Sequence, residues 1–471
     1  MNNGPSPTPF SPHPSLPRAR GRVREGSFRP PFFYGWVLVG IAFVTMAVGV
    51  SARTAFSLLF PAILAEFDWD RGVTAGAFSF GFMVSAVVTP FVGRLMDRRG
   101  PRIVVELGVI TMGAGLISAS MVTTPWQLYL TLGALVGGGV NCLAYTGQSI
   151  YLTNWFVLRR GLALSIAFSG VGIGSITILP WLGWQIATAG WRSACILLGI
   201  LLLVLLGPLN LLLRHRPEDI GLCPDGLAAG YASGAHAANV VDTAWAAVDW
   251  TLARALRTRR FWWLAAGYFC GLYTWYAVQV HQTKYLIEIG FAPSQAAWAL
   301  GLVSLVAVPG QIALGHLSDR IGREWVWMIG NLGFVVCCLV LIGLRGAPTP
   351  LLLYAMILAQ GTLGYSLTSV MGPIPAEIFE GRHYGSIFGS VMVAAILGGA
   401  AGPWITGVLF DRAGSYTIAF WIAAGCNLIS ILAIWRAAPG KVRAVAGRTG
   451  MSPPFPPPSA GEGQGEGTAA G

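Results

Sequence analysis

Charged residues are scarce in this chain of 471 residues. Asp, Glu, Lys and Arg make up 10% of it, whereas an ordinary soluble domain carries about 25% of them. Hydrophobic residues make up 54% and form long runs, and the charged residues lie between these runs in short clusters. So few charges cannot cover a surface that faces water. We therefore expect most of the surface to face lipid.

The sequence also lacks the patterns of cofactor binding and catalysis. It contains no Walker loop, which excludes direct drive by ATP hydrolysis. Its seven cysteines show no metal-ligand spacing, and most lie inside apolar runs, where they pack as small residues. No pairing of a nucleophile with a base appears either. We therefore expect no enzyme, no catalytic residue, no metal and no cofactor.

The basic residues give a net charge of +11 but form no continuous patch, which argues against nucleic acid as a partner. Of the 30 Lys and Arg, 24 fall in the two tails, the central polar segment and every second loop. Five fall in the remaining loops. Because basic loops stay inside the cell, we expect both termini in the cytoplasm and the protein in the plasma (inner) membrane.

Twelve apolar segments reach the length of about 20 residues that a helix needs to cross the hydrocarbon core. They lie near 35–61, 72–93, 103–121, 126–150, 161–183, 192–213, 261–281, 295–315, 325–344, 350–373, 384–409 and 416–436. The polar segment 214–260 predicts a cytoplasmic linker between an N-terminal bundle at 35–213 and a C-terminal bundle at 261–436. The ends, 1–34 and 437–471, have the composition of disordered cytoplasmic tails.

The two bundles repeat one another at a constant offset along the chain. After the second span stands GRLMDRRGPR, and after the eighth span stands GHLSDRIGRE. The shared positions are Gly93, Leu95, Asp97, Arg98 and Gly100 in the first segment and Gly315, Leu317, Asp319, Arg320 and Gly322 in the second. Arg160 and Arg382 match at the same offset. Two related six-helix bundles are the architecture that alternating access uses.

We expect these two loops to act as gates. Their glycines allow close approach of backbones, and an Asp can accept hydrogen bonds from a neighbouring helix N-terminus or from an Arg. Such contacts at Asp97 and Asp319 would latch the cytoplasmic face when the protein opens outward. The alternative is a plain turn whose charges only set the topology.

The doublet loop resembles the signature of the major facilitator superfamily, and the resemblance extends from Tyr34 to Arg436. Four further segments are similar to its monocarboxylate and oxalate/formate branch. They are FYGW at Phe33, NWFVLRRGLALSIAFSGVGIGS at Asn154, PAEIFEGRHYGSIFGS at Pro375 and GPWITGVLFDRAGSY at Gly402. The expected fold is an all-α membrane protein of twelve transmembrane helices in two six-helix pseudo-repeats. The resemblance implies that spans one, four, seven and ten line a central cavity.

Arg53 is the only Lys or Arg well inside an apolar run. An ionisable residue at membrane depth is a candidate for function, and the guanidinium fork fits both oxygens of a carboxylate. Arg53 lies about 25 Å along its helix from Trp36, at about 1.5 Å per residue. The alternative is therefore that its side chain extends to the outer membrane surface.

Other polar side chains share helix faces in spans four, seven and ten, and we predict that they contact the substrate. They are Asn141, Tyr145 and Gln148 in span four, Tyr273 and Tyr276 in span seven, and Ser366 and Ser369 in span ten. Hydrogen bonds between helices are the alternative role for them. We also predict His281 as a site residue, which either couples proton movement to transport or anchors the outer end of span seven.

The leading hypothesis is a secondary active transporter of a small organic anion such as a monocarboxylate, driven by proton symport or by anion exchange. Its expected partners are the anion, protons and the lipid bilayer, and we expect a monomer. No Asp or Glu lies in the middle of spans one, four, seven or ten, which disfavours a sugar symporter driven by a buried carboxylate.

The resemblance implies that some oxalate/formate exchangers and some monocarboxylate carriers use basic or acidic groups in spans eight and eleven. Here these spans carry no ionisable residue before their ends, which disfavours dicarboxylate exchange. One alternative is an exporter of amphipathic compounds with an aromatic cavity. Another, of a different class, is a non-transporting membrane sensor or assembly partner. The longest polar segment between spans is the linker 214–260, so we expect no folded soluble domain. This argues against that second alternative.

Overall fold

The computed structural model describes residues 33–227 and 238–448, and helices make up most of them. One isolated antiparallel bridge joins Val240 to Arg443. The predicted disorder of 1–34 falls almost entirely outside the described residues, as does that of 449–471. Residues 438–448 differ from the prediction, because they form two 3₁₀ turns that pack on the rest of the protein.

The N-terminal half follows the six predicted spans. Span one is α1 and α2, span two is α3, span three is α4, span four runs from α5 to α7, and spans five and six run from α8 to α9. Their bounds are α1 Gly35–Thr54, α2 Phe56–Phe67, α3 Arg71–Arg99, α4 Pro101–Ala119, α5 Pro125–Leu128, η1 Tyr129–Val136, α6 Gly137–Leu143, α7 Tyr145–Trp155, α8 Arg160–Leu201, η2 Leu202–Leu206 and α9 Gly207–Asn210.

The C-terminal half again has six spans, in which α16 to α18 form span ten. The bounds are α13 Arg259–Glu288, α14 Pro293–Ile321, α15 Arg323–Leu344, α16 Pro350–Leu358, η5 Ala359–Leu363, η6 Gly364–Ser366, α17 Leu367–Met371, α18 Pro373–Ile378, α19 Tyr384–Ala413 and α20 Thr417–Ala437. Short turns lie in the linker and after α20. They are η3 Pro217–Ile220, η4 Pro224–Gly226, α11 Thr243–Ala246, α12 Leu252–Leu256, η7 Pro439–Lys441 and η8 Ala446–Arg448.

Ten helical segments of the described chain are long and apolar enough to cross a membrane. One of them, Arg160–Asn210, has 51 residues and would measure about 75 Å if straight, far more than a bilayer of about 30 Å. Gly190 breaks it with a φ of 81°, so it contains two spans. The helix α13 is long enough at 30 residues, and its many Trp, Tyr and Gly residues together with polar residues near its ends lower its mean hydropathy. The described chain therefore contains the twelve predicted membrane helices.

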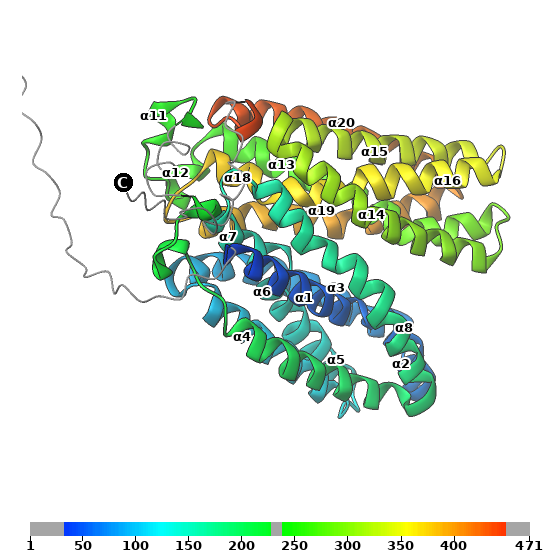
Figure 1. Cartoon of the computed structure of the whole chain (residues 1–471). Coiled ribbons are helices and arrows are strands. Elements are labelled where there is room, and N and C mark those ends of the chain that lie inside the picture. Colours follow the sequence, from blue (N-terminus) through cyan, green and yellow to red (C-terminus); the bar gives the residue numbers. More distant parts are fainter. Residues whose placement is uncertain (1–32, 228–237, 449–471) are drawn as a thin grey trace, which may run out of the picture.

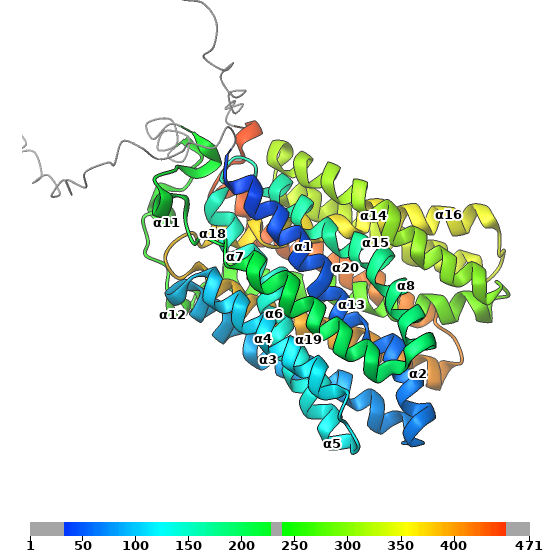
Figure 2. The same cartoon turned by 60° about the horizontal axis from the view of Figure 1, so that its bottom comes forward.

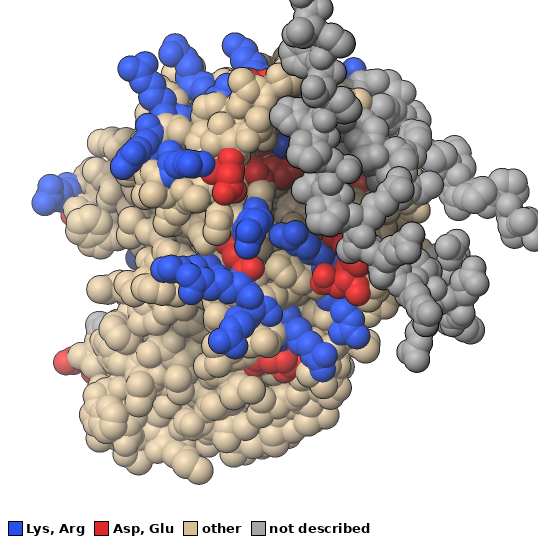
Figure 3. All heavy atoms as spheres, turned by 90° about the vertical axis from the view of Figure 1, so that its left-hand side faces the viewer, with Lys and Arg blue, Asp and Glu red and all other residues tan. Residues whose placement is uncertain are grey.

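The helices form two bundles, one from each half (Figures 1 and 2). The bundles approach each other at the end where α7, α18, α11 and α12 lie, and they diverge toward the end where α2 and α16 lie. Lys and Arg gather on the face of the first end (Figure 3). They include the exposed Arg98 and Arg99 in the last turn of α3, Arg102 in the first turn of α4, and Arg382 before α19. We call this face the basic end.

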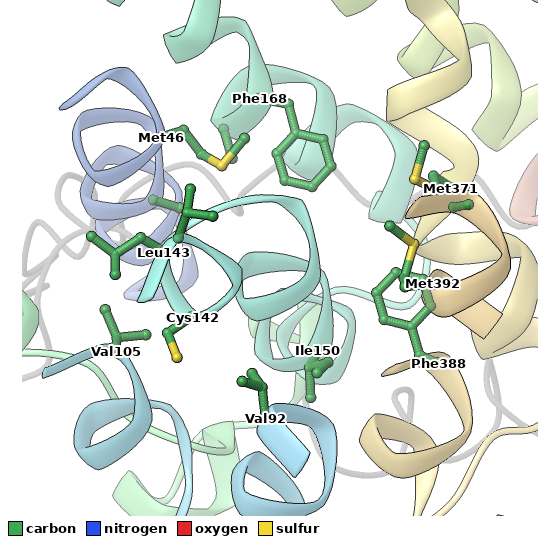
Figure 4. Close-up of a cluster of buried hydrophobic side chains, with 14 of the residues drawn as sticks. Met46, Val92, Val105, Cys142, Leu143, Ile150, Phe168, Met371, Phe388 and Met392 are labelled. Carbon is green, nitrogen blue, oxygen red and sulfur yellow. The ribbon is translucent and has the colours of Figure 1, made fainter. Parts of the chain in front are cut away.

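Buried apolar side chains continue from one half into the other (Figure 4). Met46 of α1 and Phe168 of α8 belong to the same buried cluster as Met371, Phe388 and Met392 of the C-terminal half. Large apolar side chains also cover the outside of the bundles, with Trp404 71% exposed and Met83 66% exposed. An apolar outer surface of this kind suits a protein surrounded by lipid.

Glycines let the first helix of each half pack tightly against the fifth. A Cβ added at Gly174 of α8 would clash with the backbone carbonyl of Ala47 in α1, and one at Gly398 of α19 with that of Phe269 in α13. The spacing between these two glycines is close to the offset that relates the two halves. The helix pairs α1–α8 and α13–α19 therefore use the same small-residue packing, which is typical of helices in membranes.

The change Gly174→Ala should destabilise the protein by about 1–3 kcal/mol, because its methyl group has no room against Ala47. Gly183, on the same helix, has open space at its Cβ position, so Gly183→Ala should be neutral or stabilise by up to about 1 kcal/mol. Thermal unfolding in detergent would compare the two variants. Equal unfolding temperatures would contradict the packing described here.

Candidate substrate site and gate

Arg53 lies one residue before the end of α1, with its guanidinium on the rings of α3. Its Cζ atom is 3.9 Å from the ring centroid of Phe82 and 5.8 Å from that of Phe78. Its Nη2 atom is buried, and no described residue gives Arg53 a hydrogen bond or an ion pair. A small recess with room for about one water molecule lies beside it, lined by α1, α2, α3, η1 and α6. A buried cation without a counterion is costly, so this one is available to an anion.

Tyr276 of α13 reaches this site from the other half. Its ring meets that of Phe82 edge-on at 6.0 Å, and the Arg53 guanidinium lies on that same Phe82 ring. Tyr145 of α7 and Tyr365 of η6 lie near Tyr276. Spans one, four, seven and ten therefore each contribute one polar side chain to a single cluster. It contains one guanidinium and three hydroxyl groups.

Aromatic rings surround the cluster. Phe168 of α8 meets Tyr145 edge-on at 5.0 Å, and Trp275 of α13 lies 4.3 Å from Tyr365. The indole N–H of Trp275 donates to Gln279 Oε1 at 2.8 Å, so this ring is held in place. The arrangement provides hydrogen-bond donors for a polar group and apolar walls for the rest of a small molecule.

Tyr145 and Tyr365 occupy corresponding places in the two halves. Their spacing is close to the repeat offset, and each follows an interruption of its helix. Before Tyr145 the chain is extended at Ala144, with φ −90° and ψ −159°. Before Tyr365 the helix passes through a π segment, η5, and then the 3₁₀ turn η6. Interrupted helices at such depth are common at functional sites, because they free backbone and side chains to face a cavity.

Four of the predicted site residues instead bond within their own half. Asn141 Nδ2 lies 3.4 Å from the Ser85 carbonyl oxygen, and Gln148 Nε2 donates to the Leu143 carbonyl at 2.9 Å. The Ser366 hydroxyl donates to the Leu363 carbonyl at 2.6 Å, and that of Ser369 to the Gln311 carbonyl at 3.1 Å. All four side chains are buried, so these contacts match the alternative role of joining or capping helices.

Tyr273 and His281 also lie inside the C-terminal half. Tyr273 is 3% exposed and packs in a cluster of that half alone. His281 Nε2 lies 3.0 Å from the Pro403 carbonyl oxygen, so it donates to α19, and its Nδ1 lies 3.4 Å from the Tyr416 hydroxyl. These contacts connect span seven to spans eleven and twelve and match the anchoring alternative for His281.

The sequence analysis missed Phe82, Phe168, Trp275 and Tyr365. Regular helical spacing in span ten places Ser366 and Ser369 on the expected face, but η5 and η6 change the register. They bring Tyr365 to the cluster instead. The glycines Gly361 and Gly364 were the available signal for an interrupted helix.

At the basic end, Asp97 of α3 binds the start of α19. Its Oδ1 accepts the backbone N–H of Gly385 and its Oδ2 that of Ser386, both at 2.8 Å. The Ser386 hydroxyl donates to Oδ2 at 2.8 Å as well. Gly93 packs so closely on Gly385 that a Cβ there would clash with the backbone carbonyl.

Asp319 of α14 makes the equivalent contact to the start of α8. Its two oxygens accept the backbone N–H groups of Gly161 and Leu162, both at 2.9 Å. Arg323 Nη1 lies 2.6 Å from Oδ1 and is 1% exposed, an ion pair that Asp97 lacks among the described residues. Gly315 packs on Ser165 and the Gly161 carbonyl.

The other predicted gate residues shape these turns. Gly100 and Gly322 have φ values of 77° and 116°, which favour glycine, and each joins two helices. Arg98 and Arg320 are exposed at the basic end and make no ion pair to a described residue. The gating role of these loops stays a prediction.

One further ion pair joins the halves, between Arg160 Nη2 and Glu380 Oε1 at 2.6 Å. Within 33–227 and 238–448, the hydrogen bonds and ion pairs between the two bundles are concentrated at Asp97, at Asp319 and at this pair. All three lie at the basic end. The halves are therefore latched at that end.

Asp319→Asn should destabilise the protein more than Asp97→Asn. An amide presents an NH₂ group to one of the two backbone N–H donors, which costs about 1–3 kcal/mol in either variant. In Asp319→Asn the buried Arg323 also loses one of its two counterions. Glu377 stays 2.8 Å from its Nε, so this added loss is smaller than the loss of about 3–5 kcal/mol that is typical of a buried charge left unpaired. Unfolding temperatures of the two variants would measure this difference. Equal losses would contradict a stronger latch at Asp319.

The family model of the Major Facilitator Superfamily matches residues 37–292 and 282–460 of the chain. The chain is 28% identical over 405 residues to monocarboxylate transporter 13 of Bos taurus, covering 84% of this chain and 87% of that protein. It is 29% identical over 408 residues to monocarboxylate transporter 13 of Rattus norvegicus, covering 84% and 87%. Monocarboxylate transporter 12 of Homo sapiens is 25% identical over 414 residues, covering 84% and 78%.

Solved structures share the fold over nearly their whole length. The proton:xylose symporter XylE bound to 6-bromo-6-deoxy-D-glucose aligns with a TM-score of 0.66 at 14% identity, covering 88% of this chain and 98% of that one. The transporter FucP in the outward conformation aligns with a TM-score of 0.64 at 16% identity, covering 86% and 99%. The chain is thus a multi-pass membrane transporter and not an enzyme, and it belongs to the Major Facilitator Superfamily.

Proposed function

We propose that the chain carries a small organic anion of the monocarboxylate type by alternating access, with proton symport or anion exchange as the driving process. The observation that carries this proposal is the guanidinium of Arg53, whose Nη2 is buried, which has no described counterion and which lies beside a small recess. A carboxylate would supply the missing charge and bind both edges of the fork. The names of the curated relatives, monocarboxylate transporters 12 and 13, support the same substrate class.

Tyr145, Tyr276 and Tyr365 are the proposed second element of the site. Hydroxyl groups can donate to a carboxylate bound at Arg53, and they come from both halves. A bound anion would therefore bridge the two halves at the centre of the molecule, as alternating access requires.

We further propose that the basic end faces the cytoplasm of a plasma (inner) membrane and that the chain is in its outward-facing state. The excess of basic residues at this end supports the orientation. The latch at Asp97, Asp319 and Arg160 supports the state, since it holds the halves together on the cytoplasmic side only.

Export of amphipathic compounds is a second candidate, favoured by the rings of Phe82, Phe168, Trp275 and Tyr365 around the site. Aromatic walls bind apolar bodies of many shapes. The anion carrier is the better supported function, because an unpaired cation in the same site serves no purpose for a neutral or cationic compound.

The test is uptake of labelled carboxylates (formate, lactate, pyruvate, oxalate and longer 2-oxo acids) into proteoliposomes, with and without an inward proton gradient or an internal anion. Arg53→Gln should raise the KM for the transported anion about 10- to 100-fold, since a hydrogen bond to a charged group contributes about 1.5–3 kcal/mol. Arg53→Lys should recover only part of this, because an ammonium cannot bind both oxygens.

Lys284→Gln is the matched control. Lys284 is also a cation of the outer half, but it is 68% exposed and pairs with Glu288 at 3.8 Å. It should leave saturable uptake in place. If Arg53→Gln transports like the unmodified protein, Arg53 is not the anion site. If no carboxylate is transported under any condition, the exporter is the better candidate.

A further inference from the structure

A short segment after the last membrane helix runs back across the basic end. The helix α20 ends at Ala437, and Ala438 turns the chain with a φ of 52°. The following residues, Val442–Arg448, are here called the strap. Two of its side chains, those of Val442 and Val445, are buried, although the segment lies outside every membrane helix.

The strap pairs with the linker as a short antiparallel ladder. The bridge joins Arg443 to Val240, the Ala444 N–H donates to the Asn239 carbonyl at 2.7 Å, and the Val241 N–H donates to the Val442 carbonyl at 2.9 Å. Two segments that stand before and after the whole C-terminal bundle in the sequence therefore form one unit on the basic end.

The strap contacts the N-terminal half at the turn before α8, to which the first part of the linker is also bound. Asp225 of the linker accepts the backbone N–H groups of Val157 and Leu158 at 2.8 and 2.9 Å. Burial raises the pKa of Asp225, and these two hydrogen bonds oppose that rise. Ala446 of the strap and Leu227 of the linker pack on Leu158, which is 2% exposed.

The same unit is fastened to the C-terminal half. The indole N–H of Trp245 in the linker donates to the Ile378 carbonyl at 2.8 Å. In the strap, Arg443 Nη2 lies 2.8 Å from Glu380 Oε2, and Arg448 Nη1 lies 3.4 Å from Glu324 Oε1.

Glu380 connects the strap to the latch between the halves. Its other oxygen binds Arg160 of the N-terminal half at 2.6 Å, so one carboxylate lies between two arginines. Arg443 is 8% exposed, and Arg160 is 6% exposed. Without Arg443 the Glu380 carboxylate would lose the ion pair at its Oε2, and the latch would lose part of its support.

We infer that the strap acts as a clasp that holds the basic end closed. Its contacts to one of the two halves have to break before that end can open. The clasp touches Leu158 on one half and Glu380 and Glu324 on the other, so a rocking motion that separates these halves has to break one set of contacts. This role adds to the proposed transport function and holds whichever solute is carried.

The test measures the distance between the halves at the basic end, without any substrate. Spin labels at Arg102→Cys and Arg436→Cys, both exposed and one on each half, report it by double electron–electron resonance. Cys223, Cys270 and Cys426, which are not fully buried, are first replaced by Ser. Arg443→Ala should raise the population with the longer distance at least about fivefold, the lower end of typical coupling between linked sites.

Lys441→Ala is the matched control. Like Arg443→Ala it removes one positive charge, two residues earlier in the chain, but the Lys441 side chain is exposed and has no described ion pair. It should leave the distances unchanged. Ala444→Pro is a second test that keeps every charge, since it removes the N–H bonded to Asn239 and fixes the backbone φ angle at that position. A chain ended after Lys441, compared with one ended after Arg448, removes the strap itself.

Longer distances in Arg443→Ala, in Ala444→Pro and in the chain ended after Lys441 would support the clasp. Unchanged distances in the folded strap variants would overturn it, as would an equal change in Lys441→Ala. Where one variant does not fold, the others decide, because each breaks a different contact. A carrier of another solute would give the same distances, so a failure here is distinct from a failure of the anion proposal.

Discussion

The closed end of this protein depends on one kind of bond, made by a carboxylate to the first backbone N–H groups of a helix in the other half. Asp97 makes it to α19, and Asp319 makes it to α8. Those N–H groups have no partner in their own helix and lie at its positive end, so a carboxylate suits them well. When the halves separate, water has to replace every one of these bonds. The balance between the closed and open states is therefore an exchange of charge-assisted hydrogen bonds for hydration.

The charge of the central cluster constrains how the proposed carrier can work. Arg53 brings one positive charge, and no described carboxylate interacts with it. A bound monoanion makes the site neutral, whereas a dianion would leave it with a buried negative charge. The empty site keeps an unpaired cation, which makes reorientation without an anion costly. This charge balance favours the exchange of anions, and it fits a monocarboxylate better than a dicarboxylate.

The sequence predicted the fold well because its signals are local and repeated. Apolar runs gave all twelve helices, and the constant repeat offset related the gate loops, of which Asp97 and Asp319 prove to make equivalent bonds. The site was harder to predict. Arg53, Tyr145 and Tyr276 meet as one cluster, but Tyr365 could not be found by helical spacing, because π and 3₁₀ turns shift the register of span ten. A polar side chain such as that of Gln148 also looks the same in sequence whether it faces a cavity or caps a carbonyl.

The site and the latch are connected by the helices that carry them. The helix α3 carries Phe82 beneath Arg53 and, about 22 Å further along at about 1.5 Å per residue, Asp97 in the latch. On the other side, α13 carries Tyr276 and is packed on α19 through Gly398, with α19 also offering the N–H groups that Asp97 binds. An anion that drew Tyr276 toward Arg53, as proposed above, would move α13 with α19 relative to α3, and Asp97 joins α3 to α19 in the latch. Because packed helices move as rigid bodies, a small shift at the centre reaches the basic end without any change inside either bundle.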